Sequence, residues 1–223
     1  MIPLKDDNPT LHTPVITIAL IVINVIVFLY EFTLGPEAQA FIIKFGLIPT
    51  ELVHGVELTP NASFPSSLNV ITSMFMHGGI MHLAGNMLFL WIFGNNVEDV
   101  LGPIHFIAFY LIAGVFAAGL FIVTAPNSEV PLVGASGAIS GVLGAYVLRW
   151  PRARVLTLIF FGWFIRLIWI PAMVVLGLWF LLQLIFSLPT LGSANTGGVA
   201  YMAHIGGFVF GIGYAKLFWS KFQ

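Results

Sequence analysis

Residues 134–148 read Gly-Ala-Ser-Gly-Ala-Ile-Ser-Gly-Val-Leu-Gly-Ala-Tyr-Val-Leu, an apolar stretch rich in small residues. We predict a helix over Ser136–Leu148, because Arg149 and Pro151 end the apolar run. A helix of this length covers about 20 Å, whereas the hydrocarbon core of a bilayer is about 30 Å thick. One end of the helix is therefore expected to be buried inside the protein, and Ser136 is expected below the membrane surface.

The composition is that of an integral membrane protein. Of the 223 residues, 59% are hydrophobic and 8% charged, and the mean hydropathy is +1.01; in soluble domains about a quarter of the residues are charged. A net charge of −1 gives no indication of nucleic-acid binding, and the lack of cysteine excludes disulfides and thiol chemistry. The apolar runs are continuous, which favours helices over the alternating strands of a membrane barrel.

Six apolar segments predict an all-α membrane protein, a bundle of six transmembrane helices in one domain over residues 1–223. The first segment has no convincing small-residue cleavage site, so we expect an uncleaved span and not a signal peptide. The length allows about six spans of roughly 20 residues with short connections. The predicted spans are 14–32, 79–95, 104–124, 136–148, 171–186 and 201–219.

The connections between these segments differ in character. The long first loop, residues 33–78, still contains apolar pieces, and we expect short helices lying in the outer interface. Residues 94–103 predict a tight polar turn. Residues 155–170 predict an interfacial stretch, and 187–200, rich in Gly, Ser, Asn and Thr, a flexible loop.

The distribution of basic residues predicts the orientation. Short cytoplasmic loops carry an excess of Lys and Arg. With the N-terminus inside, seven of the eight basic residues lie on the inner side, and only Lys44 lies outside. We therefore expect a cell-membrane protein with both termini in the cytoplasm.

In this orientation four polar side chains reach the same depth. His82 and Asn86 lie in the outer half of the second span, Ser136 at the outer end of the fourth, and His204 in the outer half of the sixth. Ionisable residues inside a membrane are costly and are a functional hypothesis by default. The plain alternative is that each forms a structural hydrogen bond between helices.

A serine and a histidine on different helices can act together only if those helices pack closely. The small residues that let membrane helices approach occur on both segments: Gly137, Gly141 and Gly144 on one, and Gly206, Gly207 and Gly211 on the other. A base within hydrogen-bond reach would make the serine hydroxyl a nucleophile. We expect no carboxylate to orient the base, and so a dyad and not a triad.

His82 and Asn86 are four residues apart and so share one helix face. They could be an interhelical hydrogen-bond pair. The alternative is a donor pair for the oxyanion of an acyl transfer, where fixed donors supply several kcal/mol.

Taken together, these pieces resemble the rhomboid family of intramembrane serine proteases. The matching motifs are His77-x4-His82-x3-Asn86, Gly134-Ala135-Ser136-Gly137 and Ala203-His204-x2-Gly207-x3-Gly211, and the resemblance covers about residues 46–215. It implies that Ser136 is the nucleophile and His204 the base. It also implies that Asn86 and His82 help to form the oxyanion site with the Ser136 N–H. The implied substrates are transmembrane segments of other proteins, cut near the outer face without metal or other cofactor. The fifth span and residues 187–200 would form a gate and a cap.

One position departs from the family pattern. Many family members carry an aromatic residue four positions after the nucleophile, where this chain has Ser140.

A non-cleaving rhomboid-like protein that binds client spans is the alternative function. A transporter is a third possibility, but the polar groups stop in the outer half, whereas transport needs a path across the bilayer. The expected partners are membrane-protein substrates and lipid, with no indication of a particular oligomeric state.

Overall fold

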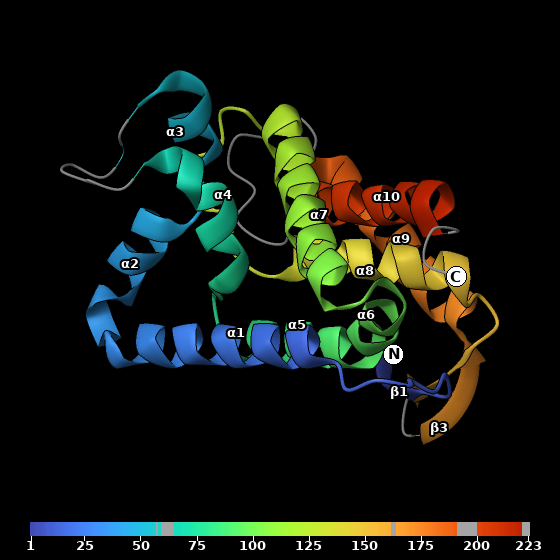
Figure 1. The fold of residues 1–223 in the computed structure, drawn as a ribbon. Helices are drawn as coiled ribbons and strands as arrows, with labels where there is room; N and C mark the ends of the chain where they lie inside the picture. The colour runs from blue at the N-terminus through green and yellow to red at the C-terminus, as the bar shows by residue number, and fades with distance from the viewer. Residues whose placement is uncertain (57, 59–64, 162–163, 191–199, 220–223) are drawn as a thin grey trace.

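The computed structural model describes residues 1–56, 58, 65–161, 164–190 and 200–219, and it is mostly helical, as predicted, with one small sheet (Figure 1). The longer helices are α1 (Val15–Thr33), α5 (Ile80–Phe89), α7 (Pro103–Thr124), α8 (Ser136–Arg149), α9 (Ala172–Ser187) and α10 (Tyr201–Phe218). By length and composition α1 and α7 could each cross a membrane, and α9 is a shorter apolar helix. Apart from α5, these helices begin and end within one residue of the predicted segments.

The second predicted segment is longer and less regular than expected. α5 continues through a π-helical turn (Leu90–Gly94) into α6 (Asn95–Leu101), and the chain turns only at Gly102, where φ is 73°. The predicted polar turn over 94–103 is therefore wrong. The polar residues Asn96 and Glu98 are buried within α6, where they bond the N-terminal segment.

The expectation of an all-α fold is also wrong for one part of the chain. The strands β2 (Arg154–Phe161) and β3 (Phe164–Pro171) form an antiparallel hairpin, and β1 (Ile2–Asp6) pairs with β2. These strands occupy the stretch that we predicted as interfacial. It is rich in Ile, Val, Leu, Phe and Trp, a composition that suits strands as well as helices.

The first loop contains short helices, as expected: α2 (Ala38–Phe45), α3 (Pro49–His54) and α4 (Asn69–Thr72). Figure 1 shows α2 and α3 at one end of the molecule and β1 with the hairpin at the other. Leu47 forms a two-hydrogen-bond bridge with Leu132, in the segment that leads into α8. The loop is thus anchored beside the start of α8.

The core of the fold is the contact between α8 and α10. A Cβ atom added to Gly207 or Gly211 would collide with the carbonyl oxygen of Gly137 or Gly141, respectively, and one added to Gly144 would collide with the backbone of Phe208. The two backbones therefore touch directly, as the spacing of glycines predicted. Buried Ala113 and Ala117 of α7 lie against the same glycines.

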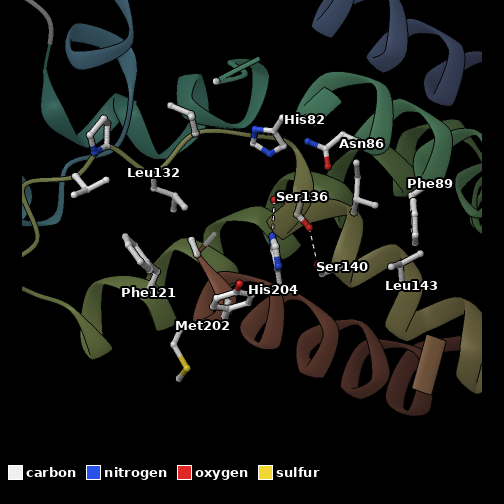
Figure 2. Close-up of a pocket in the computed structure, with 18 of the residues that line it drawn as sticks. His82, Asn86, Phe89, Phe121, Leu132, Ser136, Ser140, Leu143, Met202 and His204 are labelled. Atoms are coloured by element: carbon white, nitrogen blue, oxygen red, sulfur yellow. Dashed lines mark hydrogen bonds between the residues drawn. The ribbon is translucent and has the colours of Figure 1, made fainter. Parts of the chain in front are cut away.

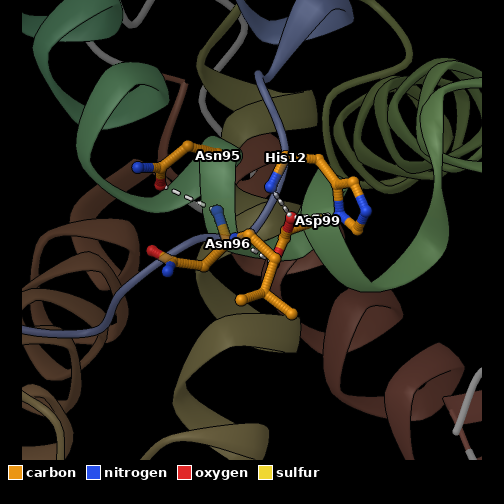
Figure 3. A network of polar contacts seen from close by, with 5 residues as sticks. His12, Asn95, Asn96 and Asp99 are labelled. Atoms are coloured by element: carbon orange, nitrogen blue, oxygen red, sulfur yellow. Dashed lines mark hydrogen bonds and ion pairs between the residues drawn. The ribbon is translucent and has the colours of Figure 1, made fainter.

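The beginning of α1 is held by carboxylates of α6. Glu98, 3% exposed, accepts hydrogen bonds from the backbone N–H groups of Ile16 (2.8 Å) and Thr17 (2.7 Å). Asp99 accepts from the N–H groups of Leu11 and His12, and its carboxylate also contacts the His12 ring at 2.9 Å (Figure 3). The first N–H groups of a helix have no acceptor within the helix. Glu98 supplies acceptors to two of them from 81 and 82 residues away in sequence, whereas Asp99 binds the segment just before α1.

Candidate active site

Ser136 is the first residue of α8 and follows a tight approach of the chain to α5. Gly134 has φ 122°, and its N–H donates to the carbonyl of Ser73 at 2.8 Å. A Cβ at Gly134 would lie 2.7 Å from the His82 ring and in a strained conformation. Glycine is therefore required for this segment to pass beneath His82 and to place Ser136 at the helix start.

His204 reaches Ser136 from α10. The distance between His204 Nε2 and Ser136 Oγ is 2.8 Å, and the histidine is 9% exposed (Figure 2). The two residues are 68 positions apart in sequence, and the direct contact of the α8 and α10 backbones is what brings them together. The structure thus places the predicted serine and histidine in hydrogen-bond contact.

The other ring nitrogen of His204 has a partner that sequence reasoning missed. Gln183 of α9, 8% exposed, places Oε1 2.8 Å from His204 Nδ1. One signal could have indicated it: Gln183 is the only amide or charged side chain in the predicted span 171–186.

An aromatic ring also packs on His204, although it comes from a different element than in the family pattern. The Trp179 ring of α9 lies 5.8 Å from the imidazole, centroid to centroid, with an interplanar angle of 35°. Ser140, which stands at the usual aromatic position, instead donates its hydroxyl to the carbonyl of Ser136 at 2.6 Å. Trp179 therefore takes over the packing on the histidine.

Asn86 and His82 lie on the opposite side of Ser136 from His204 (Figure 2). Asn86 is 7% exposed, and within the described part of the chain its Nδ2 has no hydrogen-bond acceptor. The N–H of Ser136 belongs to the first turn of α8, where backbone donors have no acceptor within the helix. A buried donor without an acceptor is costly, and the Asn86 Nδ2 atom is such a donor beside Ser136.

His77 and Glu31 form a second polar group beneath His82. The His77 ring lies edge-on to His82, with centroids 5.1 Å apart. Glu31, 3% exposed at the end of α1, lies 3.4 Å from the His77 backbone N–H. This carboxylate near the end of α1 contacts His77 and not His204.

Ser136, His204, Asn86 and His82 border one cavity of about 650 Å³, a size typical of ligand sites. Its polar lining includes His82, Asn86, Ser136, Ser140 and His204, and its apolar lining includes Phe89, Phe121, Leu132 and Trp179. No group of three or more His, Asp or Glu side chains in the described ranges is arranged to hold a metal ion. The chemistry available in this cavity is that of a hydroxyl beside an imidazole, with the Asn86 amide donor close by and without an acceptor among the described residues.

These features define a class: a helical membrane protein with a serine–histidine pair inside an internal cavity. The family model for the rhomboid domain matches residues 66–221, most of the chain. The chain belongs to the rhomboid family.

Several curated proteins are similar to this chain. Rhomboid protein 1, mitochondrial, of Saccharomyces cerevisiae is 30% identical over 210 residues, covering 91% of this chain and 53% of the yeast protein. Presenilin-associated rhomboid-like protein, mitochondrial, of Homo sapiens is 32% identical over 159 residues, covering 68% of this chain and 39% of the human protein. Rhomboid-like protein 11, chloroplastic, of Arabidopsis thaliana is 34% identical over 106 residues, 46% of this chain and 38% of that protein. The chain thus spans about half or less of the length of these relatives.

Proposed function

We propose that this protein is an intramembrane serine endopeptidase that hydrolyses peptide bonds in or near transmembrane segments of other membrane proteins. The observation that carries the proposal is the 2.8 Å contact between Ser136 Oγ and His204 Nε2 at the cavity. A serine hydroxyl becomes an effective nucleophile when a base accepts its proton, and this distance is within the required reach.

The proposed reaction has two halves. His204 Nε2 takes the proton of Ser136 as the Oγ atom attacks the peptide carbonyl carbon, and the imidazolium then gives that proton to the leaving amine nitrogen as the C–N bond breaks. In the second half, His204 takes a proton from water, the hydroxide attacks the acyl-enzyme, and Ser136 recovers its proton as the acid product leaves. The charge that develops on the carbonyl oxygen is stabilised by Asn86, His82 and the Ser136 N–H.

The arrangement in the membrane belongs to the same proposal. We propose one domain over residues 1–223 with six spans, both termini on the more basic side, and the cavity opening toward the opposite face. The yeast and human relatives are named mitochondrial and the Arabidopsis relative chloroplastic. The proposal therefore commits to a multi-pass protein in a lipid bilayer, whether an organelle membrane or the cell membrane expected from the charge bias.

The test is cleavage of single-span membrane proteins by the purified protein, with products identified by mass spectrometry. Ser136→Ala and His204→Ala should each abolish cleavage. Ser67→Ala and His54→Ala, which change the same residue types away from the cavity, should not. A fluorophosphonate probe should label the wild type at Ser136.

Retained cleavage by Ser136→Ala would disprove the nucleophile assignment. Binding of the single-span proteins by the wild type without any product or probe labelling would indicate the non-cleaving alternative.

A further inference from the structure

We propose that Gln183 is a positioning residue for this reaction: its side-chain carbonyl holds His204 in the tautomer that can accept the proton of Ser136. This inference rests on the proposed function and adds a third residue, from a third helix, to the serine and histidine. Ser136 begins α8, His204 lies on α10, and Gln183 lies on α9.

The first step of the argument concerns the two nitrogens of the imidazole. A neutral imidazole carries one N–H donor and one lone-pair acceptor. Gln183 Oε1, 2.8 Å from Nδ1, can only accept a hydrogen bond, so it selects the tautomer with the proton on Nδ1. The lone pair is then on Nε2, and Nε2 is the atom that lies 2.8 Å from Ser136 Oγ. The opposite tautomer would face the serine with an N–H and could not act as a base.

The second step concerns the orientation of the glutamine amide. Gln183 Nε2 donates to the backbone carbonyl of Trp179, one helical turn earlier, at 3.3 Å. If the amide were flipped, its oxygen would face that carbonyl and its NH₂ group would face Nδ1. Helix α9 itself therefore directs the acceptor atom toward His204.

The third step concerns burial and packing. Gln183 and His204 are 8% and 9% exposed, and the Trp179 ring covers the imidazole from the same helix. Water competes poorly for a bond in such surroundings, so the bond is stronger than in solvent. Unlike the carboxylate of a triad, a neutral amide adds no charge to stabilise the imidazolium, and its contribution is to orientation and tautomer.

The test compares variants of one residue. Gln183→Met keeps the length of the side chain and removes the strong acceptor, whereas Gln183→Glu keeps an acceptor oxygen. Leu184→Ala is the matched control, because Leu184 is the next residue of α9 and is 40% exposed. Each purified protein is measured for the rate of fluorophosphonate labelling of Ser136, for kcat and KM on a single-span substrate, and for its melting temperature.

We expect Gln183→Met to lose about 10- to 100-fold in labelling rate and in kcat, a part of the usual contribution of a general base, with KM and melting temperature close to the wild type. Gln183→Glu should recover most of the labelling rate, and Leu184→Ala should resemble the wild type. A purely structural glutamine would lower the melting temperature and leave kcat of the folded fraction unchanged. Wild-type labelling by Gln183→Met, or equal losses in the Met and Glu variants, would overturn the proposal.

A measurement on the wild type covers the case in which the variants do not fold. In a protein with ¹⁵N-labelled histidine, the His204 signals, identified by their loss in His204→Ala, should show the proton on Nδ1. A proton on Nε2 in the resting enzyme would overturn the proposal. Failure of the proposed function is a separate result, because then the wild type itself would neither be labelled at Ser136 nor cleave substrate.

Discussion

At the scale of the residue, the site contains both side chains that hydrogen-bond to one another and a buried donor that has no acceptor among the described residues. Ser136 and His204 contact each other, and His204 is bonded on its other side by Gln183. Asn86, by contrast, is buried with an amide donor that has no acceptor among the described residues. The open donor is the feature that an oxyanion site requires.

The Asn86→Ala variant distinguishes a role as oxyanion donor from a structural role. Loss of one oxyanion donor removes about 2–4 kcal/mol of transition-state stabilisation, which corresponds to roughly 30- to 1,000-fold in kcat. The melting temperature should not fall, because the substitution removes an unpaired buried donor and breaks no hydrogen bond of Nδ2. Cleavage kinetics and thermal melting of the same preparation measure both. An unchanged kcat would remove Asn86 from the proposed site.

Sequence reasoning identified Ser136, His204, Asn86 and His82, and the structure brings all four to one cavity. They could be found because each belongs to a spaced motif on a segment of predictable depth. Gln183 could not be assigned a role in this way. A single polar residue in an apolar helix does not reveal which neighbour it faces, since that depends on the rotation of α9 against α10.

At the scale of the element, the fold depends on how closely α8 and α10 approach. The direct backbone contact exists only because glycines leave room on both helices, at Gly144 on α8 and at Gly207 and Gly211 on α10. This contact sets the distance between Ser136 and His204. In the proposed function, activity and stability would therefore depend on the same few positions.

Two glycines of α10 provide a matched pair of substitutions. In Gly211→Ala the new methyl group would collide with the Gly141 carbonyl, so the helices must separate, and overpacking of this kind costs about 1–3 kcal/mol or more. In Gly213→Ala nothing lies within 4 Å of the new methyl, and alanine favours a helix over glycine by about 1 kcal/mol. The melting temperature and the rate of fluorophosphonate labelling should fall in the first variant, whereas the second should melt no lower than the wild type. Equal behaviour of the two variants would contradict the close-packing account.

The positions of most helices could be predicted because continuous apolar runs determine them. Two elements could not. The polar residues of α6 resemble a turn in composition, and the partners of Glu98 at the start of α1 and of Asp99 just before it are more than 80 residues away in sequence. The sheet depends on pairing between β1 and β2, which are about 150 residues apart, and no local pattern indicates such a pairing.

At the scale of the whole molecule, the N-terminal segment closes the structure by joining distant parts of the chain. β1 extends the hairpin, and the Tyr146 hydroxyl of α8 donates to Asp6 at 2.5 Å. Asp7 forms a two-point contact with Arg154, accepting from its N–H and from its Nε, each at 2.7 Å. The first residues of the chain thereby hold the end of α8 to the sheet.

The stability contributed by the contact between Asp7 and Arg154 should depend on pH. The side-chain hydrogen bond from Arg154 holds the pKa of the Asp7 carboxyl below its usual value, which is about 3.9 in an unfolded chain. Because the folded pKa is the lower one, the contribution to stability is present above about pH 4 and is lost as the pH falls through the folded value. Asp7→Asn should lower the melting temperature at neutral pH, and its difference from the wild type should shrink below about pH 4. A difference that stays constant across this range would show that the ionic contact contributes nothing.

Glu98 of α6 accepts hydrogen bonds from the start of α1, and this contact has a consequence for the order of folding during synthesis. During synthesis α1 leaves the ribosome well before residue 98 is added, so its first N–H groups must initially be satisfied by water or lipid headgroups. The amino end of α1 can bind Glu98 only after α6 has been made and has packed beside it. A nascent chain stalled before Glu98 would therefore lack these two acceptors for α1, and the packing of α6 against α1 is the step that supplies them.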